Sequence, residues 1–253
     1  MYIASPFEQQ LFDEGKRILD TASSRGIVLR ILGALAIRTH CPRFSYIHQK
    51  ASRTLSDLDM AAYQKQSPEI SRFFKDVGYK NSALGAIPGL KRAVFLGEGE
   101  LHIDIFYEGL EMCHDISFKD RLEVDYPTIP LAELLLEKMQ IVQINEKDLI
   151  DTIMLVREHH IGDGDKETLN GPRIANLCAA DWGLWRTITM NLSKVINYAQ
   201  SFADIEEEDK KNVTEKVNHL LKMIEDKPKT LKWKMRAKVG ESRVWYRTVE
   251  ERA

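Results

Sequence analysis

The sequence contains few cysteines, little excess charge and no long apolar run. Its three cysteines, Cys41, Cys113 and Cys178, are odd in number and far apart, which argues against a disulfide framework. The net charge of −2 gives no overall bias towards nucleic acid or membrane. No run of about 18 apolar residues could span a bilayer, and the N-terminus has no charged-then-apolar signal segment. We therefore expect a cytoplasmic protein with no membrane association.

The spacings that mark zinc sites are also missing. The residues that suggest such a site are His40, Cys41, His48, Cys113 and His114, yet neither Cys-x₂-Cys nor His-x₃-His occurs. Core cysteines and surface histidines explain these residues more simply, so we expect no metal site there.

What is present is an ordinary globular composition with an uneven charge distribution. Of 253 residues, 43% are hydrophobic and 29% charged, enough for one large domain or two smaller ones. Residues 204–226 carry a net charge of −4, whereas the tail 227–253 carries +6 and includes Trp233, Trp245 and Tyr246. Basic residues interleaved with aromatics suit a phosphate-rich partner such as RNA. They also suit packing onto the acidic segment just before them, and both interpretations stay open.

Periodicity and turn residues predict an α+β fold, a sheet flanked by helices with a C-terminal helical region. Strands are predicted at 27–33, 56–63, 91–97 and 100–109, the last two as a hairpin, and a short extended stretch at 121–130. Helices are predicted at 5–26, 67–79, 131–144, 145–160, 172–180, 181–202 and 206–224, with a short one starting after Gly33. Residues 162–172, rich in Gly, Asp and Asn, are the candidate linker between domains 1–162 and 163–253.

The stretch Ser-Asp-Leu-Asp-Met places two carboxylates one residue apart in a predicted strand. Because strand side chains alternate, Asp57 and Asp59 share one face while Leu58 and Met60 share the other. Like charges on one face weaken a strand. A divalent cation would offset the repulsion; the alternative is an edge strand with a solvated acidic face.

A third carboxylate, Asp104, lies in the second strand of the predicted hairpin. It shares a face with His102, while Leu101, Ile103 and Ile105 occupy the other. Alone it fits a half-exposed hairpin. Near Asp57 and Asp59 it would complete a metal-binding set.

Taken in order, these pieces resemble the minimal nucleotidyltransferase superfamily, in particular the AbiEii-like small bacterial proteins. The resemblance covers residues 27–160. It is carried by a strand ending in Gly33, a helix start, Asp57-x-Asp59 and the distal Asp104. The segment 134–155 is similar to a Lys-plus-Asp helical segment of that branch, through Lys138, Asp148 and Asp151.

The resemblance implies a nucleotidyltransferase-like mixed sheet and a Mg²⁺-dependent transfer of a nucleoside monophosphate from an NTP to an acceptor hydroxyl. Asp57 and Asp59 would hold metal, and Asp104 would bind a second metal or act as base. The acceptor would be a small molecule, a protein or a tRNA. The expected nucleotide-binding residues are Gly33, Ala34, Arg38, Arg53, Ser56 and Lys138.

The sequence departs from the family pattern in two ways, and the first of them supports a rival interpretation. The family turn is Gly-Gly or Gly-Ser, whereas here Gly33 is followed by Ala34, which offers no hydroxyl to a phosphate. The segment between that turn and Asp57 is also long. A nucleotidyltransferase-fold protein without catalysis, acting as a nucleotide-binding or interaction partner in a toxin–antitoxin-like or regulatory complex, has the same pattern.

Overall fold

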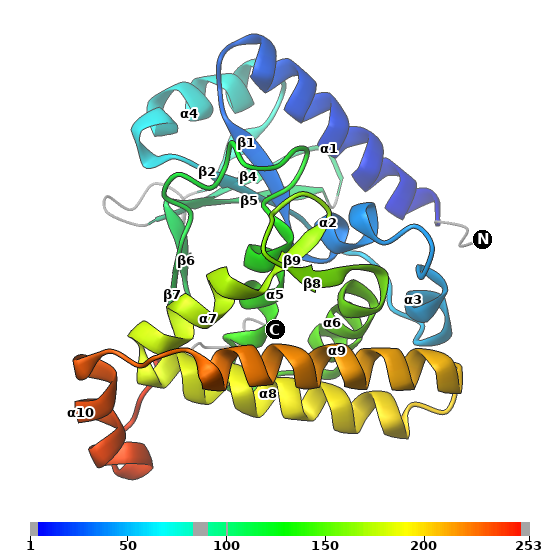
Figure 1. Ribbon diagram of the computed structural model, residues 1–253. Helices are drawn as coiled ribbons and strands as arrows, with labels where there is room; N and C mark the ends of the chain where they lie inside the picture. Colours follow the sequence, from blue (N-terminus) through cyan, green and yellow to red (C-terminus); the bar gives the residue numbers. More distant parts are fainter. Residues whose placement is uncertain (1–4, 83–90, 100, 249–253) are drawn as a thin grey trace.

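A five-stranded sheet lies at the centre of the molecule. The computed structural model describes residues 5–82, 91–99 and 101–248 (Figure 1). The strand order is β1-β2-β5-β4-β3. Strand bounds are β1 Leu29–Leu32, β2 Leu58–Ala62, β3 Lys80–Asn81, β4 Arg92–Leu96 and β5 His102–Tyr107. Strands β2 and β5 run parallel and the other neighbours antiparallel, so the sheet is mixed. The prediction of an α+β fold is confirmed.

Helices cover both faces of this sheet. Helices α1 (Pro6–Ser24) and α4 (Ser67–Asp76) lie on one side of it, while α2 (Gly33–His40) and α5 (Leu131–Met139) lie on the other (Figure 1). Between them in the chain come α3 (Tyr46–Lys50) and the short 3₁₀ helix η1 (Gln64–Gln66). Ser5 begins α1 with a capping box: its hydroxyl accepts from the backbone of Glu8, whose side chain accepts from the backbone of Ser5.

The second half of the described chain is mainly helical. After the hairpin β6 (Gly109–Glu111) and β7 (Asp115–Ser117) and helix α5 come α6 (Glu146–Glu158), β8 (His160–Gly162), β9 (Thr168–Asn170), α7 (Gly171–Ala180), α8 (Trp182–Ser201), α9 (Glu207–Asp226), α10 (Leu231–Val239) and η3 (Gly240–Ser242). Helices α8 and α9 lie side by side along one edge of the molecule (Figure 1). Asn145 caps α6 as predicted, accepting from the backbone of Asp148 at 2.9 Å.

Three local predictions are wrong. Residues 121–130 form turns that touch the sheet through a single bridge, Thr128 to Ile31, and are not a strand. The expected linker 162–172 contains β9, which pairs in parallel with β8. Strand β2 begins at Leu58, so Asp57 precedes it.

Helices from both sides of residue 162 share one hydrophobic core. Leu134 and Ile153 come from the first part, and Leu184 and Val213 from the second. The expected division at 162/163 therefore falls within packed structure.

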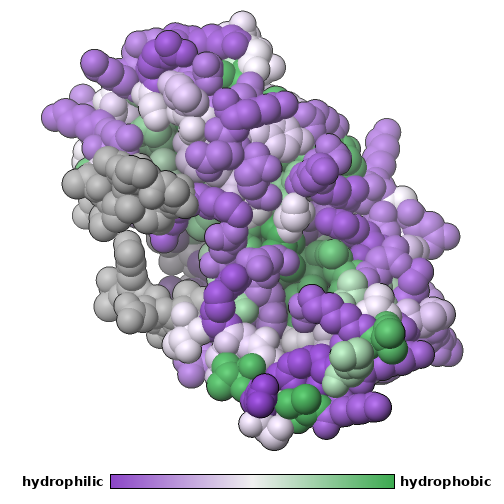
Figure 2. All heavy atoms as spheres, turned by 90° about the vertical axis from the view of Figure 1, so that its left-hand side faces the viewer, coloured by the Kyte–Doolittle hydropathy of each residue, from purple (hydrophilic) through white to green (hydrophobic). Residues whose placement is uncertain are grey.

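The basic tail returns to the body of the protein through its aromatic residues. The indole N–H of Trp245 donates to the Thr187 hydroxyl at 3.1 Å, and the backbone N–H of Arg247 donates to the Cys113 carbonyl at 3.0 Å. Leu231 and Met235 of α10 stay exposed, and Figure 2 shows apolar side chains at the surface over this helix. Within the described residues, no helix is long and apolar enough to cross a membrane.

Candidate active site

Asp59 and Asp104 are direct neighbours across two parallel strands. They occupy the same register position of β2 and β5, where adjacent strands lie about 4.8 Å apart. Asp59 is half-buried and Asp104 is 7% exposed. The sheet thus brings together two of the three predicted carboxylates, from positions 45 residues apart in the sequence.

Gly33 lies against this pair, at the point where β1 passes into α2. In the β1–β2 register, Leu32 faces Asp59. The φ of Gly33 is +76°, and a Cβ there would lie 3.0 Å from Asp59 Oδ2. Only glycine adopts this backbone without strain and leaves room for the carboxylate. The predicted glycine turn is therefore where the sequence placed it, beside Asp59.

The backbone N–H of Gly33 has a partner of its own. It donates to Glu137 Oε2 at 3.0 Å, from α5. Glu137 was not predicted as a site residue. The signal available in the sequence was the Glu137-Lys138 pair inside the mainly apolar helix Leu131–Met139, since charged residues are rarely buried unless paired.

The charge around Asp59 is mostly of one sign. Burial raises the pKa of Asp59 well above its usual range, and the carboxylates of Asp104, Glu137 and Asp57 raise it further, against an opposing effect of Lys138. Asp57 itself is exposed just before β2. A group of this kind favours a proton or a bound cation.

Asp104 is only partly neutralised. Its Oδ2 pairs with Arg92 of β4, while its Oδ1 is buried and has no hydrogen-bond partner among the described residues. A buried carboxylate oxygen without a partner costs free energy unless something binds it. Carboxylate oxygens are the ligands Mg²⁺ prefers, so these residues have the chemistry for the metal that the family resemblance implies, although the ligand atoms of Asp57, Asp59 and Asp104 do not all lie within 4.8 Å of one another.

Close to Asp59 and Asp104 lies a network of buried charged residues that pair with one another. Lys138 Nζ lies 3.1 Å from Asp148, 3.2 Å from Asp151 and 3.7 Å from Glu137. Burial alone would lower the pKa of Lys138, but the three carboxylates outweigh it and the pKa is raised. Lys138 is thus held by carboxylates, and its role as a phosphate ligand stays a prediction.

Asp151 is the centre of that network. Arg53 contacts its two oxygens through Nε and Nη2, both at 3.1 Å, in a bidentate pair. His48 Nε2 lies 3.0 Å from Asp151 Oδ1. Burial opposes ionisation, yet Lys138, His48 and Arg53 together lower the pKa of Asp151 far below its usual range. Asp151 therefore stays ionised.

Arg38 fixes the orientation of His48. Its Nε donates to His48 Nδ1 at 2.9 Å and its Nη2 donates to the Arg53 carbonyl at 3.2 Å. Because Nδ1 accepts, Nε2 of the neutral ring carries the hydrogen and faces Asp151. Arg38 and Arg53, both predicted to bind nucleotide, thus belong to the network around Asp151. Of the other predicted residues, Ala34 is half-buried at the start of α2 and Ser56 is exposed before β2.

The prediction that the histidines lie on the surface is wrong. His40, His48 and His114 are buried, not on the surface. Cys41 and Cys113 are buried free thiols, as expected of core cysteines.

Comparison of the sequence with protein-family models and with curated proteins gives no match.

Proposed function

We propose that this chain is a Mg²⁺-dependent nucleotidyltransferase that moves a nucleoside monophosphate from an NTP to an acceptor hydroxyl. The observation that carries the proposal is the cross-strand pair of Asp59 and Asp104 beside Gly33. A glycine turn, a helix start and carboxylates on two neighbouring interior strands combine a close backbone approach with oxygen ligands for a metal.

Each residue has a distinct role in this proposal. Asp59 and Asp57 hold the metal, which when bound would neutralise phosphate charge during in-line transfer. Asp104 contributes its unpartnered Oδ1, either to a second metal or as the base that accepts the acceptor's proton. Arg92 orients Asp104 by binding its other oxygen. Gly33 lets the triphosphate approach the start of α2.

Among the acceptor classes, the tail favours tRNA. A cavity of about 500 Å³ is lined by Trp182, Trp233 and Trp245 together with Lys232, Arg236 and Arg247. Tryptophan faces stack on bases, and basic side chains attract phosphates. The aromatic rings also contact one another and α8, so the cavity has a packing role as well.

A specific observation favours the rival function, a fold that binds nucleotide or a partner without catalysis. The Gly33 N–H already donates to Glu137, and Ala34 supplies no hydroxyl. Both features reduce the phosphate-binding capacity of the turn.

The test is thermal stability against each of the four NTPs, with and without Mg²⁺. A ligand at 100 times its Kd stabilises the folded state by about 2.7 kcal/mol. We expect one or more NTPs to stabilise the wild type only with Mg²⁺, and Asp59→Asn, Asp104→Asn and Asp57→Asn to lose most of that effect. The control is Asp204→Asn, an exposed carboxylate far along the chain, which should behave as wild type.

Pyrophosphate release separates the two functions. Mg²⁺-dependent release with candidate acceptors supports the transferase. Nucleotide stabilisation without turnover supports the nucleotide-binding form of the rival. No stabilisation by any NTP contradicts the transferase and favours a protein that only binds a partner.

A further inference from the structure

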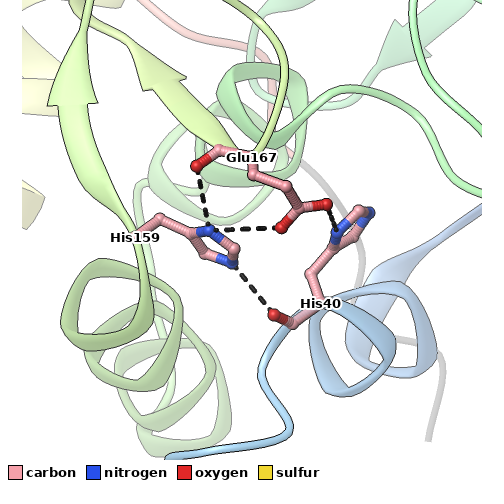
Figure 3. Close-up of side chains that lie close together, drawn as sticks. All are labelled: His40, His159 and Glu167. Carbon is pink, nitrogen blue, oxygen red and sulfur yellow. Dashed lines mark hydrogen bonds and ion pairs between the residues drawn. The ribbon is translucent and has the colours of Figure 1, made fainter.

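A second cluster of metal-ligating side chains lies away from the carboxylate pair. His40 ends α2, His159 follows α6, and Glu167 precedes β9 (Figure 3). Glu167 lies between the two imidazoles: Oε1 is 3.2 Å from His40 Nδ1 and Oε2 is 3.6 Å from His159 Nδ1. Seven residues of α-helix separate Gly33 from His40, about 10 Å at 1.5 Å per residue.

The hydrogen bonds of the two rings assign their protons. His40 Nε2 lies 2.6 Å from the Thr128 hydroxyl, which donates its own hydrogen to the Ile129 carbonyl at 2.8 Å. The hydroxyl therefore accepts from His40 Nε2. His159 Nε2 lies 3.1 Å from the His40 carbonyl, which can only accept. With Nε2 donating in both rings, each neutral imidazole presents a lone pair at Nδ1.

Both Nδ1 atoms then face other acceptors. Each lies near the Glu167 carboxylate, and His159 Nδ1 is also 3.3 Å from the Glu167 carbonyl. Lone pairs that converge without a hydrogen between them repel, and the repulsion is removed either by a bound metal ion or by a proton on each Nδ1. In a tetrahedral site with metal–ligand bonds of about 2.0–2.1 Å, neighbouring ligands are about 3.3 Å apart. The observed separations of 3.2 and 3.6 Å lie on either side of that value.

The surroundings also fit a metal centre. Glu167 has a φ of +47°, a left-handed backbone that is costly for a non-glycine residue, and this backbone places its carboxylate between the rings. Asp125 Oδ2 lies 3.7 Å from His40 Nε2, where a carboxylate behind a liganding imidazole raises its basicity. Glu167 is 59% exposed while the imidazoles are 5% exposed, so a further position is open to solvent.

We propose that His40 Nδ1, His159 Nδ1 and the Glu167 carboxylate form a site for a zinc-class divalent cation, distinct from the carboxylate site proposed for Mg²⁺. Imidazole suits zinc and its neighbours in the transition series, whereas Mg²⁺ prefers oxygen. The cation ties the end of α2 to the β8–β9 segment. The proposal stands independently of the nucleotidyltransferase function.

The experiment is Zn²⁺ titration calorimetry on chelator-stripped protein, with Co²⁺ absorption as a second readout. We expect one Zn²⁺ per chain and a visible Co²⁺ band of low coordination number. Glu167→Gln should weaken Zn²⁺ binding at least tenfold. Because Glu167 is exposed, the variant should fold as wild type, which circular dichroism checks. Thr128→Val, which removes the acceptor behind His40, should also weaken binding, by about 10–100-fold.

The matched control is His219→Gln, an exposed histidine on α9, which should leave binding unchanged. Zn²⁺ binding should also survive in Asp59→Asn, which keeps this site separate from the carboxylate pair. Absence of saturable Zn²⁺ binding, or equal binding by Glu167→Gln, would overturn the proposal. The cluster would then be two protonated histidines paired with Glu167.

Discussion

Two groups of carboxylates lie on either side of the Glu137-Lys138 pair, and they differ in balance. Around Asp151 the charge is matched by the cations Lys138 and Arg53 at about 3 Å, with the neutral His48 ring at a similar distance. On the interior strands β2 and β5, Asp59 and Asp104 have a single ion-pair partner among the described residues, Arg92. The pKa of the carboxyl group is lowered at Asp151 and raised at Asp59.

This difference in pairing distinguishes charged residues that stabilise the fold from those that we propose to bind a ligand. A buried group whose partners are complete holds the fold together, and removing one partner leaves the others uncompensated. A group of like charges with an unpartnered oxygen is destabilising by itself and needs a ligand from outside. We expect the network to stabilise the scaffold and the pair of Asp59 and Asp104 to form the proposed site.

The largest effect should come from breaking the balanced network. Asp151→Ala leaves Lys138, Arg53 and His48 buried without their shared anion, so we expect a loss of about 3–5 kcal/mol in the free energy of unfolding. Urea denaturation measures it. Asp57→Ala, which removes an exposed carboxylate, is the control and should stay within about 0.5 kcal/mol of wild type. A loss below 1 kcal/mol at Asp151 would mean that the network does not support the fold.

An intermediate effect is expected at the glycine turn that joins the two groups. Gly33→Ala places a Cβ 3.0 Å from Asp59 Oδ2 at a φ of +76°, whereas Gly26 has a similar φ of +70° and nothing within 4 Å of its Cβ position. Backbone strain of about 1–2 kcal/mol applies to both.

The comparison of these two variants isolates the contact with Asp59. Gly33→Ala should therefore be the more destabilising by urea denaturation, and it should also lose the Mg²⁺-dependent stabilisation by NTP that Gly26→Ala retains. Equal costs, with nucleotide binding intact in both, would contradict the close approach of Gly33 to Asp59.

Local features of this fold follow from local sequence. Ser5 and Asn145 cap helices because their side chains reach backbone N–H groups three residues ahead. The order Gly33, Asp59, Asp104 was likewise visible, since alternation marks the face of a strand.

The rest depends on contacts between distant residues, which spacing along the chain does not encode. Glu137 and Gly33 are hydrogen-bonded although they lie 104 positions apart in the sequence. Arg53 and Asp151 are hydrogen-bonded at a separation of 98 positions. His40 and His159 are 119 positions apart, so no short zinc spacing could indicate them. The nucleotide-binding roles predicted for Lys138 and Arg38 did not include their contacts with Asp151 and His48, because these partners come from other helices.

The smallest expected effect is the change in the pH dependence of stability caused by Asp59→Asn. It is also the most specific test of the pair of Asp59 and Asp104. Because the pKa of Asp59 is raised in the folded protein, the folded state binds a proton more tightly than the unfolded state, where the pKa is about 3.9. The free energy of unfolding of the wild type should therefore decrease as the pH rises from about 4 through the raised pKa of Asp59. Asparagine has no proton to lose, so in chelator at pH 8 the variant should be more stable, by about 1 kcal/mol or 2–4 °C in Tm.

At pH 4 this advantage should vanish, because wild-type Asp59 is then protonated and neutral like asparagine. Mg²⁺ with NTP should reverse the order at pH 8, since only the wild type gains from the ligand. The buried Glu137, whose pKa is also raised by burial, contributes to the slope in both proteins, so the difference between the two pH profiles belongs to Asp59. A variant less stable than wild type at pH 8 in chelator would show that Asp59 is balanced like Asp151, and the contrast between the two groups of carboxylates would fail.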